Sequence, residues 1–142
     1  MTAQPRRKLV MAGLAALLAA GCGSGGPETH SVTGTVRIDG GDASVLAGGA
    51  VEGALEGDKS VRASGEIKPD GSFRLETLQN GAIVAGARQG TFQVRIILPD
   101  DDATARKAAS KAVAKKYLSF DSSGLSFKSP TQAPVTLNLA KP

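Results

Sequence analysis

Apolar residues recur at every second position through most of the chain, and this pattern constrains the fold more than any other feature. A period of two is the geometry of an extended strand that buries one face. The positions predicted to face inward are Val32, Gly34, Val36, Ile38, Val51, Gly53, Leu55, Val61, Ala63, Ile67, Phe73, Leu75, Phe92, Val94, Ile96, Leu98, Val135, Leu137 and Leu139. Short alternating strands separated by turn residues predict an all-β fold, an antiparallel β-sandwich of about seven strands.

The turns between these strands are uneven in how well the sequence defines them. Pro69, Asp70 and Gly71 form a clear turn signal, because proline presets φ and glycine accepts a positive φ. In contrast, residues 41–57 consist largely of Gly and Ala. We expect the strand in this segment to have a poorly specified register, since few bulky side chains mark its inward face.

One segment departs from the strand pattern and predicts a helix from Ala103 to about Lys116, inserted before the last strands. Three aspartates, Asp100, Asp101 and Asp102, precede it. Two interpretations apply to them: a helix cap with favourable charge at the N-terminus, or a calcium site. Capping is favoured, because calcium sites usually draw ligands spaced along a loop.

Small apolar residues recur along this helix at helical spacing and predict a side that lies on the sandwich; they are Ala105, Ala108, Ala109, Ala112 and Val113. Four cations, Arg106, Lys107, Lys111 and Lys115, are then left facing water. They are candidates for contact with anionic headgroups or an envelope polymer, although a merely solvated helix face is the favoured interpretation.

The N-terminus has the three-part layout of a secretory signal peptide. Arg6, Arg7 and Lys8 precede an uncharged run from Leu9 to Ala20, which is about 18 Å long as a helix and too short to span a bilayer. The next residues, "LAAGC" from Leu18 to Cys22, resemble the bacterial lipobox, except that Ala19 stands where leucine is usual. Cys22 is therefore a predicted lipidation site. Since it is the single cysteine, it has no partner in the chain for a disulfide.

This interpretation divides the chain into a signal peptide (1–21), a flexible tether (22–30) and one domain (31–142). The pair Arg6-Arg7 also fits twin-arginine export, but the general secretory route is favoured. Gly23 replaces the aspartate that commonly retains lipoproteins in the inner membrane, which favours the outer membrane. Three of the 17 Lys and Arg, and none of the 13 Asp and Glu, lie in residues 1–21. The exported chain is thus nearly neutral and not a predicted nucleic-acid binder.

Four motifs, taken in chain order, resemble the carboxypeptidase regulatory-like domain found in small lipoproteins of planctomycete-type bacteria. These domains have a transthyretin-like, Ig-like β-sandwich fold, and the resemblance implies a domain without a peptidase site. The matching residues are Val32, Gly34 and Val36; Asp70, Gly71 and Phe73; Gly90, Phe92 and Val94; and Lys116, Tyr117, Ser123, Gly124 and Leu125. The same resemblance leads us to expect the Tyr117 ring to pack beneath a strand edge where the helix ends.

Candidate catalytic residues are scarce. His30 is the single histidine and falls in the predicted tether, so we expect neither a catalytic triad nor a zinc site. A phosphate-binding glycine loop is absent, and no cofactor is predicted. The sequence therefore predicts a non-enzymatic module, anchored to a membrane by lipid, that contacts an unidentified envelope protein or polymer. The alternative is a carbohydrate-binding module related to starch-binding sandwiches; it is disfavoured because aromatic residues are few.

Overall fold

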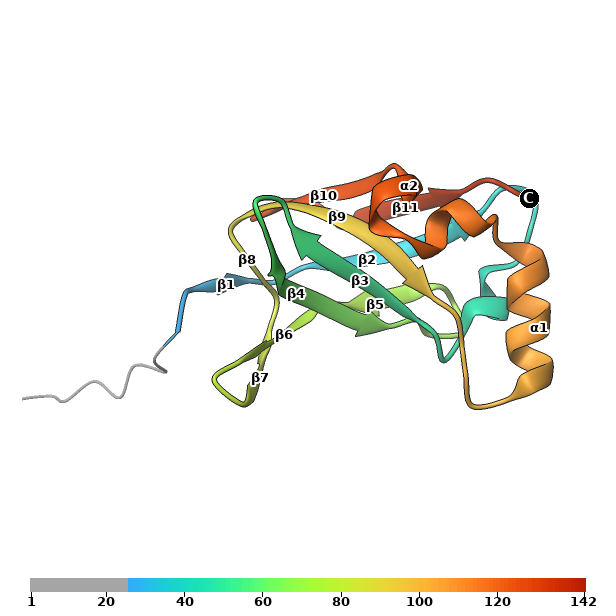
Figure 1. The fold of residues 1–142 in the computed structure, drawn as a ribbon, viewed down its shortest axis with the longest axis horizontal. Helices are drawn as coiled ribbons and strands as arrows, with labels where there is room; N and C mark the ends of the chain where they lie inside the picture. Colours follow the sequence, from blue (N-terminus) through green and yellow to red (C-terminus); the bar gives the residue numbers. More distant parts are fainter. Residues whose placement is uncertain (1–25) are drawn as a thin grey trace, which may run out of the picture.

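The computed structural model describes residues 26–142 and shows a mostly β fold (Figure 1). Its largest sheet has six strands in the order β10, β9, β3, β4, β6, β7, and all neighbouring pairs are antiparallel. The bounds are β3 Ala50–Leu55, β4 Asp58–Glu66, β6 Glu76–Gln79, β7 Ala82–Ala85, β9 Gly90–Ile97 and β10 Leu125–Ser129. Central strand β3 therefore pairs with β4 on one side and β9 on the other.

Two smaller sheets complete the strand arrangement. A three-stranded sheet has the order β11, β2, β5, and a two-stranded sheet pairs β1 with β8. The bounds are β1 Thr29–His30, β2 Thr33–Ile38, β5 Ser72–Arg74, β8 Ala87–Arg88 and β11 Val135–Leu139. Strands β11 and β2 run parallel. The predicted count of about seven strands is too low, because the described residues form eleven strand segments. The predicted antiparallel arrangement holds for every pair except β11 with β2.

The higher count arises because the chain changes sheets within stretches that the sequence pattern marks as continuous strands. After β5 the chain passes through fully buried Leu75 into β6, which belongs to the larger sheet. The Leu75 N–H donates to Val32 O, and Leu75 O accepts from Gly86 N. Leu75 thus hydrogen-bonds to both neighbouring segments at the crossing point.

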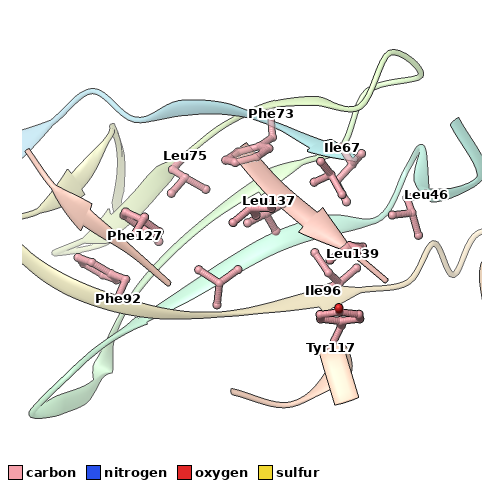
Figure 2. Packing of buried hydrophobic residues seen from close by; sticks show 14 of the residues in the cluster. Leu46, Ile67, Phe73, Leu75, Phe92, Ile96, Tyr117, Phe127, Leu137 and Leu139 are labelled. Carbon is pink, nitrogen blue, oxygen red and sulfur yellow. The ribbon is translucent and has the colours of Figure 1, made fainter. Parts of the chain in front are cut away.

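The two larger sheets enclose one hydrophobic core (Figure 2). Phe73 and Leu137 come from the smaller sheet, and Phe92 and Phe127 from the larger. The rings of Phe92 and Phe127 are stacked, with centroids 5.0 Å apart and an interplanar angle of 2°. All nineteen predicted inward positions except Leu55, Leu98 and Val135, which are half-buried, lie in the buried class. The alternation therefore correctly predicted the buried face of the strands that it identified.

Strand β3 has a defined register despite its small residues, contrary to our expectation. Six consecutive residues, Ala50–Leu55, pair with β9 without interruption. Pairing with β4 is regular from Ala50 to Ala54 and shifts at Leu55. Two neighbouring strands, rather than side-chain bulk alone, specify the register here.

The segment predicted as one helix contains a shorter helix and the start of a 3₁₀ turn, and a second short helix follows beyond it. α1 spans Ala103–Ala112, a 3₁₀ turn η2 spans Lys115–Leu118, and α2 spans Phe120–Ser123. A further 3₁₀ turn, η1, spans Ala43–Leu46. The prediction of one helix to Lys116 was wrong because Val113 leaves helical geometry (φ −119°, ψ 127°) and is buried. Along α1, Ala109 is buried and Ala105 and Ala112 are half-buried, but Ala108 is exposed.

Tyr117 is buried at the junction between the helical segments and the sheet, as expected. Its hydroxyl oxygen accepts a hydrogen bond of 2.8 Å from the Ala140 N–H, one residue after β11 ends. Figure 2 shows the ring lying next to Ile96 and Leu139. Tyr117 thereby links η2 to the end of β11.

The N-terminal segment is more ordered than the predicted tether. Thr29 and His30 form β1 and pair with Arg88 and Ala87. The tether prediction is therefore wrong for these residues, and half-buried His30 is part of a strand rather than a solvated linker. β1 lies at one end of the long axis and α1 at the other (Figure 1). Among residues 26–142, no helix is long and apolar enough to cross a membrane.

Candidate functional site

Cys22, the predicted lipidation site, lies outside the described residues, which begin at Gly26. Three other regions could serve a function: the cations of α1 and η2, a charged cluster on the large sheet, and the hairpin formed by β6 and β7.

The four predicted surface cations are all exposed. Arg106 forms an ion pair, because its guanidinium contacts the Asp100 carboxylate. Lys107 and Lys111 stand one turn apart on α1, and Lys115 begins η2. Exposure at these positions agrees with the sequence prediction, although the Arg106 charge is partly neutralised by its neighbour.

The three aspartates before α1 have separate roles that include capping. The Asp102 side chain accepts from Thr104 N at 2.8 Å, which confirms the predicted N-cap. Asp100 contacts Arg106, and Asp101 is exposed. Within residues 26–142 no group of three or more His, Cys, Asp or Glu side chains is placed to hold a metal ion.

Contact with the headgroups of the anchoring membrane would need these cations near the start of the described chain, but they lie at the opposite end of the domain (Figure 1). Strand β9 runs from Gly90, next to β8, to Ile97, which leads toward α1. At about 3.3 Å per residue, this strand alone separates the two ends by roughly 23 Å. The α1 surface therefore faces away from the end where the chain leads back to Cys22 (Figure 1).

A charged cluster covers the outer face of the large sheet, on three neighbouring strands. Glu52 on β3 lies between Arg62 on β4 and Arg95 on β9. The Glu52 Oε1 atom is 2.6 Å from Arg62 Nη1, and Oε2 is 2.8 Å from Arg95 Nη2. Both guanidinium groups also lie over the ring of Phe120, at 4.7 and 4.9 Å from its centroid. The sheet pairing therefore assembles one carboxylate and two guanidinium groups on the surface, and α2 adds the aromatic ring.

The ionisation of Glu52 reflects opposing effects. Burial acts to raise the pKa of Glu52, but hydrogen bonds and charge from Arg95 and Arg62 outweigh it, so the pKa lies below its ordinary value of 4.5. Only 13% of this side chain is exposed. This arrangement keeps the Glu52 carboxylate ionised and bound to both arginines. The two ion pairs therefore link β3 to its neighbours β4 and β9.

Replacing Glu52 with glutamine should lower the stability of the protein and flatten its acid dependence. A carboxylate with a lowered folded-state pKa adds stability above its unfolded pKa and loses it as pH falls through the folded value. We expect a loss of about 1 to 2 kcal/mol near neutral pH, and a smaller difference between variant and wild type in acid. Urea unfolding at several pH values below about 7 measures both effects.

Glu56→Gln is the matched control, because Glu56 lies just beyond the same strand, is exposed, and forms no ion pair within the described residues. It should change stability little at any pH. Equal effects of the two substitutions would show that the two arginines do not stabilise the Glu52 carboxylate.

Phe120 is the one aromatic ring in residues 26–142 that is not buried. Sugar-binding sites commonly present an exposed aromatic platform beside polar groups, so this residue bears on the carbohydrate-binding alternative. Its ring already contacts two guanidinium groups. These contacts disfavour its use as a sugar platform.

The β6–β7 hairpin is the third region, and sequence analysis did not detect it. Asn80 and Gly81 connect the two strands with positive φ values of 50° and 78°, as a two-residue type I′ turn requires. An Asn-Gly pair between alternating apolar residues is a strong hairpin signal and could have revealed it. Leu78 and Ile83 pair across the hairpin, and each is 71% exposed.

A shallow pocket lies between this hairpin and the N-terminal segment. Gly26, Pro27, Glu28 and Thr29 line one side, and Gln79, Asn80, Ala82 and Val84 line the other. Gln79 Nε2 donates to Pro27 O at 3.2 Å, while Gln79 Oε1 is buried without a hydrogen-bond partner. The N-terminal segment is thus held against one face of the hairpin.

Comparisons with known proteins add no relative: no family model, curated protein or solved structure matches the chain. The fold and the surface together define a small, mostly β domain whose candidate functional regions lie at its two ends and on the outer face of its large sheet.

Proposed function

We propose that this protein is a lipid-anchored lipoprotein that presents a non-catalytic β-sandwich as a structural or protein-interaction module in the cell envelope. The observation that carries the proposal is the N-terminal sequence: a basic cluster, an uncharged run and small residues, ending at Cys22. Acyl chains on Cys22 would supply a durable anchor, because two chains bury enough methylene groups to hold a protein on a bilayer.

The arrangement of the domain supports presentation away from the membrane. Gly26 is four residues after Cys22, and the chain from Pro27 to His30 is fastened along one end of the domain. The far end, with α1, would then face the periplasm or cell exterior. Export by the general secretory route and residence in the outer membrane are part of this proposal, the latter because Gly23 follows the anchor.

One observation favours a non-enzymatic role. Glu52 is bound by two arginines, which suits a fixed ion-pair network rather than proton exchange. We propose the transthyretin-like topology for the domain on the motifs around Val36, Phe73 and Phe92. Its partner is an envelope protein or polymer, and the nearly neutral exported chain does not favour nucleic acid.

Cys22→Ser should abolish lipidation and release the protein from the membrane fraction. Mass spectrometry of the membrane-extracted wild type should show acyl chains on a fragment that begins at Cys22. Ser24→Ala is the matched control, since it alters a neighbouring small polar residue and should leave the protein in the membrane. An intact peptide spanning Ala20 to Gly23 in the mature protein would contradict the proposal.

A further inference from the structure

One face of the β6–β7 hairpin is apolar and exposed toward its tip, where Leu78 and Ile83 lie, whereas exposed Glu76 begins the same face at the base. Leu78 and Ile83 are directly paired, and both are exposed although large apolar residues usually lie in the core. Figure 1 shows the hairpin projecting from the body of the domain at the end where β1 lies. The whole stretch 77–87 carries no charged residue. Transferring the hairpin beyond Glu76 out of water would therefore incur no cost for desolvating a charge.

The opposite face of the hairpin is covered by the N-terminal segment, and this contact sets the direction of the chain. Thr29 Oγ1 donates to Ala85 O, near the base of the hairpin. Pro27 O accepts from Gln79 Nε2, next to the turn, and a Cβ added to Gly26 would lie 2.9 Å from Gln79 Oε1. Traced toward the N-terminus, the chain thus runs along the hairpin from base to tip.

The chain therefore leaves the described domain at the hairpin tip. Gly26 lies four residues after Cys22, and a fully extended chain of that length spans at most about 14 Å. An acyl chain on Cys22 would bring the bilayer surface within this distance of Gly26, which lies against the side chains of Gln79 and Asn80 beside the turn. Leu78 and Ile83 lie two residues behind the turn, or about 7 Å at the rise of a strand. That distance matches the depth of about 5 to 10 Å reached by interfacial apolar faces.

We propose that the β6–β7 hairpin inserts Leu78 and Ile83 into the bilayer interface beside the Cys22 anchor, fixing the domain at this end. The inference rests on the proposed lipidation of Cys22. A second protein copy is the competing occupant, since β7 is the outer strand of the large sheet and such edges can pair with another chain. The short covalent distance to Cys22 favours the bilayer.

Single tryptophans provide the test, because the chain contains none. Ile83→Trp places the probe on the hairpin. Ile97→Trp is the matched control, since Ile97 is also an exposed isoleucine, 39% exposed, at the end of β9 that leads to α1. The full-length lipoproteins are purified from membranes, checked for acylation by mass spectrometry and reconstituted in phosphatidylethanolamine and phosphatidylglycerol vesicles. Half of the samples contain lipids brominated on the acyl chains, which quench nearby tryptophan.

Insertion predicts a blue-shifted emission from the tryptophan at position 83 and a loss of that emission in brominated vesicles, with neither effect at position 97. Adding Leu78→Lys to the Ile83→Trp protein should weaken the quenching. Acylated protein with an unquenched probe at position 83 overturns the insertion alone. A blue shift without quenching, together with crosslinked dimers, would show that Leu78 and Ile83 contact a second copy of the protein. That result also overturns the proposed insertion. Protein without acyl chains overturns the proposed function and this inference together.

Discussion

Replacing Phe92 with alanine should lower the free energy of unfolding by about 3 to 5 kcal/mol. Phe92 is fully buried, and its ring is stacked on Phe127, so the substitution removes both buried apolar area and a ring partner. The two sheets meet at this point, and the rigid strands around it would not collapse to fill the space. Urea unfolding of the purified proteins measures the loss.

Phe120→Ala is the matched control for Phe92, because it removes the same side chain from the surface. Phe120 is half-exposed and contacts the two guanidinium groups of the Glu52 cluster, so its loss should cost only about 1 kcal/mol. Equal destabilisation by the two substitutions would show that the stacked pair does not occupy the centre of the core.

Gly71→Val is the second substitution with a large expected effect, about 2 to 4 kcal/mol. Gly71 has a φ of +84°, which confirms the left-handed geometry predicted for this turn and which a β-branched residue adopts only under strain. A Cβ at this position would also lie 2.6 Å from Val36 O. Since Val36 N donates to Gly71 O, the turn and β2 cannot move apart to make room for the valine side chain without losing that hydrogen bond.

Gly57→Val separates the effect of backbone strain from the effect of the close approach to Val36 O. Gly57 has a similar φ of +88°, but nothing lies within 4 Å of an added Cβ, so this variant should show only the backbone strain of about 1 to 2 kcal/mol. Thermal or urea unfolding of both variants gives the difference. If Gly71→Val unfolds like the wild type, the turn geometry is wrong; if it matches Gly57→Val, the close approach to Val36 contributes nothing.

The two ends of the domain have different surfaces, and this difference matters for the proposed function. Next to β1, the surface is a hairpin that carries no charge beyond Glu76 and exposes two large apolar side chains, Leu78 and Ile83. At the far end, α1 and η2 present Lys107, Lys111 and Lys115 to solvent. In a protein anchored through Cys22, these lysines would be directed away from the anchoring membrane. An anionic envelope polymer or protein is therefore a better candidate for their contact than the headgroups of that membrane.

Whether a feature of the structure could be predicted depends on how far apart in the sequence the interacting residues lie. The inward faces of β2 and β9, the Gly71 turn and the Asp102 cap all follow from residues within a few positions of one another. The Asn80-Gly81 hairpin depends on an equally local signal, so it too was within reach of the sequence although it was not predicted. The Glu52 cluster was beyond reach, because Arg62 and Arg95 are 10 and 43 residues away from Glu52.

By itself, the sequence determined the β class of the fold, the buried face of the strands with alternating residues and the start of α1, because alternation and capping are local properties. Tertiary structure decided the parallel pairing of β11 with β2, the change of sheets at Leu75 and the end of α1 at Val113. It also placed α1 at the end opposite the start of the described chain. The physical reason is that a period of two specifies which side of a strand is buried but not which strand lies beside it. The choice of neighbour depends on how the two sheets jointly fill one core.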